Sequence, residues 1–436
     1  MATIIPFRGI RYDEAKVGSI SDVASPPYDR VYPDVQAACY ARSAHNIARI
    51  IKGKAQEGDT EGGENVYTRA AGCLNEWLRE GILVRDAEPG LYVYHQEYSF
   101  GGDRLVRRGV IALGRLEPER VHAHERTLKG PKEDRLKLMR ATEANFGHIF
   151  MLYDDPQRTA DAALTEAIDG ETPLIEATDV DGNAHRVWRV TDPGVIGRVQ
   201  AALADKDLYI ADGHHRYETA VTFLREAEAA GWRPAAPESF DVRMMTLFNV
   251  AEPGMSIRPI HRLVHGIEGF DAEAMLARAG EHFEVTRHDS FDAMGEAVSA
   301  AAERHAFGCY ARDVCASLVL RDESIADEQV AVDRSTDYRR LDVSILHTLI
   351  LERLLGIDAD ALERQTNVTY TVEPAKGVMA VDEGEEQAFF LLNATSPDEV
   401  VRVADHGEKM PQKSTDFYPK LLTGLVLTRM EIDRPE

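Results

Sequence analysis

The stretch LYIADGHHRYETA, residues 208–220, decides how this chain of 436 residues is interpreted. Its apolar run Leu208–Ala211 is typical of a buried strand, and a helical pattern begins near Tyr217. The polar or turn-forming residues between them are Asp212, Gly213, His214, His215 and Arg216. Because a strand stops where a helix starts, we expect these residues on the rim of a sheet.

Such a turn can bind an anion, since free N–H groups at a helix N-terminus attract phosphate. Gly213 allows a ligand to approach the backbone, and Arg216 can donate two parallel hydrogen bonds to phosphate or carboxylate. Asp212 can hold Mg²⁺ or accept a hydroxyl proton. On an extended backbone one of His214 and His215 reaches the ligand while the other packs or orients Asp212. The alternative is a plain turn with Asp212 as a helix cap, which the histidines and the arginine disfavour.

The composition narrows the class of partner. The chain has 74 acidic and 50 basic residues, a net charge of −24, which argues against DNA or RNA but allows a small basic pocket. Its four cysteines form no CxxC pair, so reduced thiols are expected. No apolar run is long enough for a membrane span, and the N-terminal residues lack the long apolar region of a signal peptide. We therefore expect a cytoplasmic protein that acts on a small molecule, without nucleic acid or membrane partners.

Strand patterns alternate with helical ones along the chain, but hairpins interrupt them, which favours an α+β (mixed α/β) fold over a regular doubly wound sheet. Hairpins are expected around Gly101–Gly102 and Asp181–Gly182, and helices over 134–144 and 216–231. We divide the chain into an N-terminal α/β segment with a hairpin, a core segment with the polar motifs, and a C-terminal α/β segment, over residues 1–115, 116–265 and 266–436.

A second polar segment is HAHERTLKGPKEDR, residues 122–135. His122 and His124 would share a face of an extended chain, but no third metal ligand is evident nearby, so a metal pair is the less favoured hypothesis. Glu125 is a candidate general base, and a plain ion pair is an equal alternative. The candidate phosphate ligands in this segment are Arg126, Lys129 and Lys132.

Other polar segments leave two interpretations open. The segment MPQKSTDFYPK, residues 410–420, places a lysine beside two hydroxyl side chains, a combination that suits phosphate binding. A solvent-exposed loop without a ligand can have the same composition. The candidate phosphate ligands are Lys413, Ser414 and Thr415, and Lys420 lies in the same segment. The prolines of SPPYDRVYPD, residues 25–34, either present Tyr28 and Asp29 to a site or make a structural turn.

His261 is expected to be a buried, hydrogen-bonded histidine. The apolar helix 341–357 is core or a homodimer seam, and core is favoured.

Together these motifs resemble, nearly end to end, the bacterial and archaeal family catalogued as domain of unknown function 1015. The resemblance rests on PFRGIRYD, SPPYD, HERT, KEDRLKLMRATEANFGHIF, LYIADGHHRYETA, IRPIHRLV, LDVSILHTLILERLLGI and MPQKSTDFYPKLLTGLV, in this order. Members of the family are often encoded beside phosphoglycerate dehydrogenase and phosphoserine aminotransferase, which implies serine metabolism.

The DGHHR turn also resembles the phosphate-cradling turn of the ParB/sulfiredoxin superfamily, one branch of which phosphorylates free serine with ADP or ATP. That resemblance implies a ParB/sulfiredoxin-like core around the turn. It also implies that Asp212, His214 and Arg216 form the phosphate and metal end of a site, with Mg²⁺ on Asp212. In the free serine kinases a carboxylate acts as the base, and Glu125 is the candidate for that role here. The assignment rests on the type of residue, because no shared motif aligns Glu125 with the carboxylate of those kinases.

These observations predict a phosphotransferase that acts on serine or O-phosphoserine, with a nucleotide or water as the other partner. Glu125 would activate the hydroxyl, and His214 would be the acid or base on the other side. The alternative is a regulatory protein that binds a nucleotide or a phosphorylated metabolite without turnover. The distance from Glu125 to the Asp212 turn separates the two hypotheses. A ParB-type nuclease is disfavoured by the net charge of −24.

Overall fold

The computed structural model describes residues 3–125 and 129–435. The chain forms two compact units. Unit 1 comprises Met1–Ser256 and Pro419–Glu436, and unit 2 comprises Ile257–Tyr418. Unit 2 is therefore an insertion in the sequence of unit 1. The three segments predicted from the sequence are a division by motif, and that division stays a prediction.

Unit 1 is built on a nine-stranded mixed sheet. In spatial order its strands are β6 (Val121–Ala123), β11 (Leu208–Asp212), β8 (Ile149–Tyr153), β13 (Val242–Asn249), β5 (Asp103–Arg115), β4 (Leu91–Phe100), β10 (Ala184–Val190) and β9 (Ile175–Thr178), and β1 (Ile4–Ile5) pairs with β5. β6 runs parallel to β11, and β8 parallel to β13, whereas the other pairs on this path are antiparallel. Three short two-stranded pairs are β2 (Ile10–Tyr12) with β3 (Leu83–Arg85), β7 (Ala144–Asn145) with β22 (Thr428–Arg429), and β12 (Arg233–Pro234) with β23 (Ile432–Asp433).

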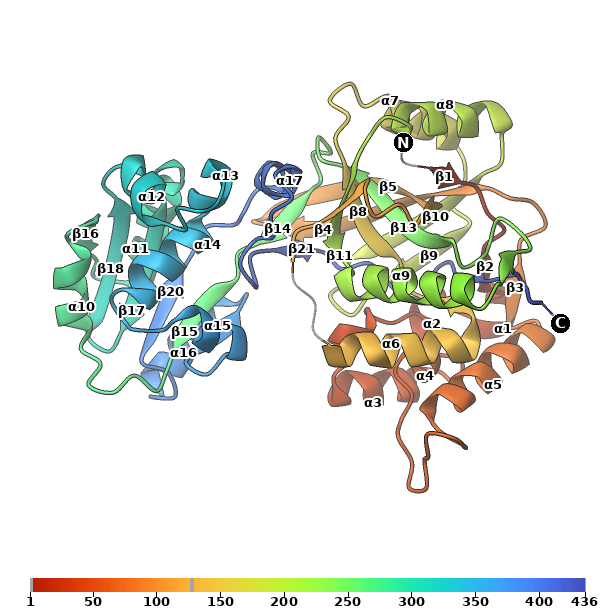
Figure 1. Cartoon of the computed structure of the whole chain (residues 1–436), viewed down its shortest axis with the longest axis horizontal. Helices are drawn as coiled ribbons and strands as arrows, with labels where there is room; N and C mark the ends of the chain where they lie inside the picture. The colour runs from red at the N-terminus through yellow and green to blue at the C-terminus, as the bar shows by residue number, and fades with distance from the viewer. Residues whose placement is uncertain (1–2, 126–128, 436) are drawn as a thin grey trace. The chain divides into compact units, whose positions relative to one another are not determined.

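Helices cover both sides of this sheet. They are α1 (Glu14–Val17), α2 (Ile20–Val23), α3 (Pro33–Arg42), α4 (Ala48–Ile51), α5 (Val66–Arg79), α6 (Lys129–Thr142), α7 (Thr159–Ile168), α8 (Pro193–Leu203) and α9 (His214–Ala229), with a 3₁₀ turn η1 (Tyr28–Arg30). α7 and α8 lie on one side of the sheet, and α6 and α9 lie side by side on the other (Figure 1). The apolar strand residues between them form one continuous core.

The mixed α/β class predicted from the sequence is confirmed. Both hairpins form, since β4 pairs with β5 around Gly101–Gly102 and β9 pairs with β10 around Asp181–Gly182. Two helix starts differ from the prediction: α6 begins at Lys129 rather than 134, and α9 begins at His214 rather than 216. α9 starts early because Gly213 turns the chain within a single residue, so both histidines lie in the first helical turn.

Unit 2 has an antiparallel six-stranded sheet. Its strands in spatial order are β16 (Phe283–Arg287), β18 (Val314–Leu320), β17 (Ala306–Ala311), β20 (Ala388–Leu391), β15 (His261–Val264) and β19 (Val368–Thr371), and β14 (Ser256–Arg258) pairs with β21 (Asp416–Tyr418). Its helices are α10 (Ala272–Ala279), α11 (Phe291–Ala300), α12 (Glu323–Gln329), α13 (Thr336–Arg339), α14 (Asp342–Ile345), α15 (Ala359–Arg364), α16 (Pro374–Asp382) and α17 (Pro397–Asp405), with the 3₁₀ turn η2 (Ala302–Arg304) and the π-helical segment η3 (Leu346–Glu352).

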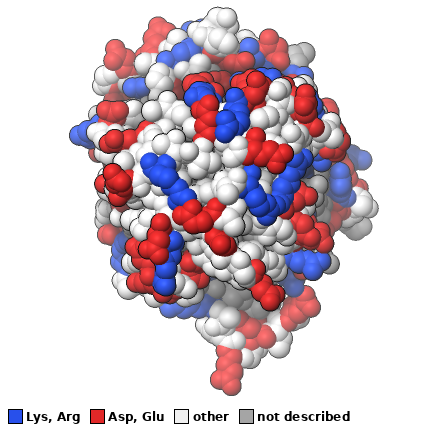
Figure 2. All heavy atoms as spheres, turned by 90° about the vertical axis from the view of Figure 1, so that its left-hand side faces the viewer, with Lys and Arg blue, Asp and Glu red and all other residues white. Residues whose placement is uncertain are grey.

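The apolar segment predicted as a helix over 341–357 consists of α14 and η3, and its apolar side chains belong to the core of unit 2. His261 is buried and accepts a hydrogen bond from the N–H of Leu392, as expected. Within the described residues, no helix is long and apolar enough to cross a membrane. On the face drawn in Figure 2, lysines and arginines are interspersed with acidic side chains.

The central sheet of unit 1 is packed so closely that one added methyl group is expected to destabilise the fold. A Cβ at Gly109 in β5 would lie 2.5 Å from Phe248 Cδ1 and 2.6 Å from the carbonyl oxygen of Leu247. We expect Gly109→Ala to lower the free energy of unfolding by about 1–3 kcal/mol, measured by urea titration.

The control is Gly72→Ala, because Gly72 lies inside α5 and an added Cβ would meet nothing within 4 Å. Alanine there should raise the free energy of unfolding by about 0.5–1 kcal/mol. Equal stabilities of the two variants would contradict the packing described for β5.

Candidate functional site

The turn between β11 and α9 has the geometry of a polar strand-to-helix junction. β11 ends at Asp212, and Gly213 adopts a φ of 101°, in the left-handed region. A Cβ at Gly213 would also lie 2.9 Å from Nε of Arg216. Glycine is therefore required twice, by the backbone conformation and by the room that the arginine needs.

Asp212 is held between two cations. Its Oδ1 accepts from Nη2 of Arg216 at 3.0 Å, and its Oδ2 accepts from Nζ of Lys420 at 2.8 Å. The Asp212 side chain is only 17% exposed. Burial alone would raise the pKa of Asp212, but the charges of Lys420 and Arg216 lower it well below its ordinary range. Two cations against one carboxylate leave a net positive charge at the turn, which suits phosphate.

Lys420 reaches this site because its backbone is fastened to the central sheet. The carbonyl oxygen of Lys420 accepts from Nε2 of Gln96 at 3.0 Å, and that of Pro419 accepts from Nη2 of Arg107. Arg107 is fully buried, with its guanidinium carbon 4.7 Å from the ring centroid of Phe150. Among these residues the sequence analysis named only Lys420, as part of the 410–420 segment.

Glu125 lies beside the turn, and the parallel pairing of β6 with β11 explains why. β6 ends at Ala123, paired with Ile210, so the chain leaves both strands at the same edge of the sheet. Oε2 of Glu125 is 3.8 Å from Nδ1 of His214. The ring of His214 packs edge-on against that of His124, with centroids 4.6 Å apart.

His124 is a packing residue in this arrangement. Burial lowers the pKa of His124 to about 4, so its ring is neutral at pH 7. His122 instead stacks on Tyr209, with ring centroids 5.2 Å apart. The two histidines considered as a metal pair thus contact different neighbours. In the part of the chain that the structure describes, no group of three His, Cys, Asp or Glu side chains could hold a metal ion.

The other residues of unit 1 that the sequence analysis named as phosphate ligands are on α6 and α9, except for Arg126. His215 follows His214 on α9, is half-buried, and burial lowers its pKa. Lys132 of α6 pairs with Glu218 of α9, with 2.9 Å between Nζ and Oε2. Lys129 is the first residue of α6. Arg126 lies outside the described residues.

Lys413, Ser414 and Thr415 belong to unit 2. Oγ of Ser414 donates to the carbonyl oxygen of Pro411 at 2.6 Å, which stabilises the loop itself. Nη2 of the buried Arg262 donates to the carbonyl oxygen of Lys413 at 3.0 Å. The 410–420 segment is thus divided between the units, since Lys420 belongs to unit 1.

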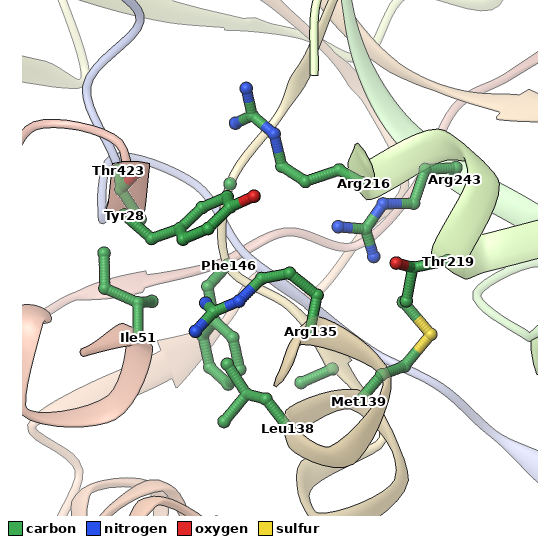
Figure 3. A pocket seen from close by; sticks show the side chains of 12 residues that line it. Tyr28, Ile51, Arg135, Leu138, Met139, Phe146, Arg216, Thr219, Arg243 and Thr423 are labelled. Atoms are coloured by element: carbon green, nitrogen blue, oxygen red, sulfur yellow. The ribbon is translucent and has the colours of Figure 1, made fainter. Parts of the chain in front are cut away.

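A pocket that the sequence analysis did not foresee adjoins the turn (Figure 3). It contains about 450 Å³ of empty space, part of it open to solvent. Its polar lining residues are Tyr28, Arg135, Arg216, Thr219, Arg243 and Thr423. Tyr28 of the proline-rich segment lines this pocket, and its presentation to a functional site stays a prediction. The available signal for Arg243 was a lone charge inside the apolar strand DVRMMTLFNV.

The chain is similar to one protein family and, distantly, to several solved structures. Residues 4–344 match the family model described as "Protein of unknown function (DUF1015)". No curated protein matches the chain. Among solved structures, a free serine kinase in complex with AMP is 12% identical, with a TM-score of 0.37, and the match covers 74% of this chain and 91% of that one.

Two further solved structures are similar at the same distant level. A conserved hypothetical protein from Pyrococcus furiosus is 12% identical, with a TM-score of 0.33, over 71% of this chain and 92% of that one. A C-terminally truncated SbnI from Staphylococcus aureus is 10% identical, with a TM-score of 0.34, over 72% of this chain and 85% of that one.

The ion pairs of Asp212 predict a pH-dependent stability. Because its folded pKa is lowered, Asp212 stabilises the fold above its unfolded pKa of about 3.9, and this contribution is lost as the pH falls toward the folded pKa. The substitution Asp212→Asn leaves Arg216 and Lys420 without their carboxylate partner. We therefore expect it to lower the free energy of unfolding at pH 7 by about 3 kcal/mol. The difference between the variant and the parent should shrink below about pH 4.

A matched control is Asp360→Asn, which removes the same i,i+4 pairing with an arginine, Arg364, from an aspartate that is 79% exposed. Its urea unfolding curve should nearly coincide with that of the parent, because exposed pairs contribute little. A difference for Asp212→Asn that is constant from pH 7 to pH 3 would contradict this assignment.

Proposed function

The chain belongs to the DUF1015 family of proteins of unknown function, and we propose that it is a phosphotransferase acting on a small hydroxy amino acid. Serine is the proposed acceptor and ADP or ATP the proposed donor. The observation that carries the proposal is the carboxylate of Glu125, 3.8 Å from His214, at the same turn as the Asp212 cluster. A base beside a phosphate-binding turn is what a phosphoryl transfer requires and a binding protein does not.

The cations of the turn supply the charge that a phosphoryl group needs. Phosphoryl transfer depends mainly on positioning and on neutralising charge. Arg216 uses Nη2 for Asp212, and a guanidinium has further N–H donors that can reach phosphate oxygens. Lys420 adds a second positive charge 2.8 Å from the same carboxylate. Asp212 then orients both cations rather than acting on the substrate.

The proposed reaction moves one phosphoryl group and one proton, and no atom is oxidised or reduced. Glu125 takes the proton from the substrate hydroxyl as its oxygen forms a bond to the terminal phosphorus of the nucleotide. The bond from that phosphorus to the bridging oxygen breaks, and the nucleotide leaves with one phosphate fewer. His214 lies within reach of Glu125 and can orient it or share its proton. Water in place of the hydroxyl, acting on O-phosphoserine, would give the phosphatase reaction.

The residues present do not form a resident Mg²⁺ site. Both carboxylate oxygens of Asp212 already accept from cations, and the described residues contain no cluster of three metal ligands. Mg²⁺ would therefore have to arrive bound to the nucleotide phosphates, with one or two carboxylates completing its shell. Arg216 and Lys420 remain the protein's own means of neutralising phosphate charge.

Glu125→Gln tests the proposal. We expect phosphoserine formation from serine and ATP or ADP, followed by phosphorus NMR, to fall on the order of 10²–10⁴-fold in kcat. Nucleotide affinity, measured by calorimetry, should change little, because the amide keeps the shape of the side chain and the cations stay in place.

Glu88→Gln is the control, since Glu88 is exposed and distant in sequence from the turn. It should retain the parent's kcat. Tight nucleotide binding without turnover by the parent protein, in both reaction directions, would refute the enzyme and favour a regulatory binding protein.

A further inference from the structure

The pocket beside the turn contains hydrogen-bond donors that the fold leaves unused. Within residues 3–125 and 129–435, three residues that line it carry four buried polar atoms with no hydrogen-bond partner. They are Nε of Arg216, Oγ1 of Thr219, and Nε and Nη1 of Arg243. A buried donor left unpaired costs about 1–3 kcal/mol. Four such atoms in one pocket point to a ligand that supplies the acceptors.

Arg243 is the strongest of these signals. The residue is only 5% exposed, and its guanidinium projects from β13 into the pocket between Arg216 and Arg135 (Figure 3). Burial, together with repulsion by Arg216 and Arg135, lowers the pKa of Arg243 to about 9. A buried cation placed beside two others needs an anion.

The charges around the pocket do not supply that anion. Arg135 pairs with Asp134, with 2.5 Å between Nη2 and Oδ2, and Arg216 pairs with Asp212. Neither carboxylate residue lines the pocket, and the described lining includes no Asp or Glu. Arg243 has no carboxylate within ion-pair distance in the described part of the chain.

The number of donors and their positive charge favour one class of anion. A carboxylate offers two oxygens in one plane, whereas a phosphoryl group offers three oxygens arranged around phosphorus and a charge near −2. Here the unpartnered atoms belong to two guanidiniums and one hydroxyl, carried by two elements, α9 and β13. The rest of the wall is apolar, from Ile51, Leu138, Met139 and Phe146. An apolar wall excludes water and strengthens the attraction between ion and guanidinium.

We propose that Arg243, Thr219 and the guanidinium of Arg216, with Arg135 at the rim, form a binding site for a phosphoryl group. This site shares Arg216 with the Asp212 and Lys420 cluster and adds Arg243 and Thr219, which that cluster does not use. It takes either inorganic phosphate or the phosphoryl group of a small organic phosphate. The inference does not depend on turnover, since the pocket binds the anion even in a protein that transfers no phosphate.

The test is binding of inorganic phosphate to the full chain, in a phosphate-free buffer of constant ionic strength. Calorimetry and thermal unfolding should show saturable binding with a Kd below about 1 mM. Arg243→Met should weaken phosphate binding about ten-fold or more, because it removes a charged donor. The variant should fold, since it deletes a buried cation that has no counter-ion. It should also unfold at a temperature no lower than the parent in the absence of phosphate.

A second variant keeps the test decisive if Arg243→Met does not fold. Thr219→Val preserves the shape of the side chain and removes only the hydroxyl donor, and it should weaken phosphate binding several-fold. Arg198→Met is the matched control, because Arg198 is 54% exposed and pairs with Glu166 on the surface. Its affinity for phosphate should equal that of the parent.

Other anions distinguish the sources of the phosphoryl group. Tighter binding of phosphate or pyrophosphate than of AMP identifies a free phosphate site, and tighter binding of AMP identifies an organic phosphate; both support the proposal. Saturable binding of malonate with none of phosphate would overturn it. So would phosphate affinities that are equal in the parent and in both pocket variants, or no phosphate binding up to about 10 mM.

Discussion

Asp212 carries its charge where little water reaches it, and the architecture of the site follows from how that charge is compensated. A buried carboxylate must be paired or it becomes neutral. One cation, Arg216, comes from the next helical turn, which requires the abrupt start of α9 at Gly213. The other, Lys420, comes from the returning chain, which requires the hold of Arg107 and Gln96 on its backbone.

Features that depend on neighbours in sequence were predictable. The apolar run, the glycine and the polar residues of 208–220 indicated the strand, the turn and the helix, and all three are present. Only the helix start was misplaced, because a single left-handed glycine suffices to turn the chain. The sequence analysis used the distance from Glu125 to the turn to separate an enzyme from a binding protein, but it could not predict that distance. Glu125 lies near the turn because β6 pairs in parallel with β11, and the periodicity of a sequence does not specify which strands pair.

Features that depend on distant segments were not predictable. Arg243 is one charge in an apolar strand, and nothing in its neighbourhood indicates that α9 carries an arginine and a threonine to the same pocket. Lys413 and Lys420 are close in the sequence but belong to different units, which their spacing gave no reason to expect. Whether side chains from two segments meet is decided by the sheet order, which one sequence does not reveal.

The separation of Asp212 and Lys420, 208 residues along the chain, bears on how the protein is made. On the ribosome, β11 and α9 emerge while Lys420 is still untranslated, and the whole of unit 2 must follow before it appears. Until then Arg216 is the one of these two cations that the chain contains. The Asp212 cluster can therefore be completed only after the C-terminal return is made, and a chain whose translation stops within unit 2 lacks Lys420.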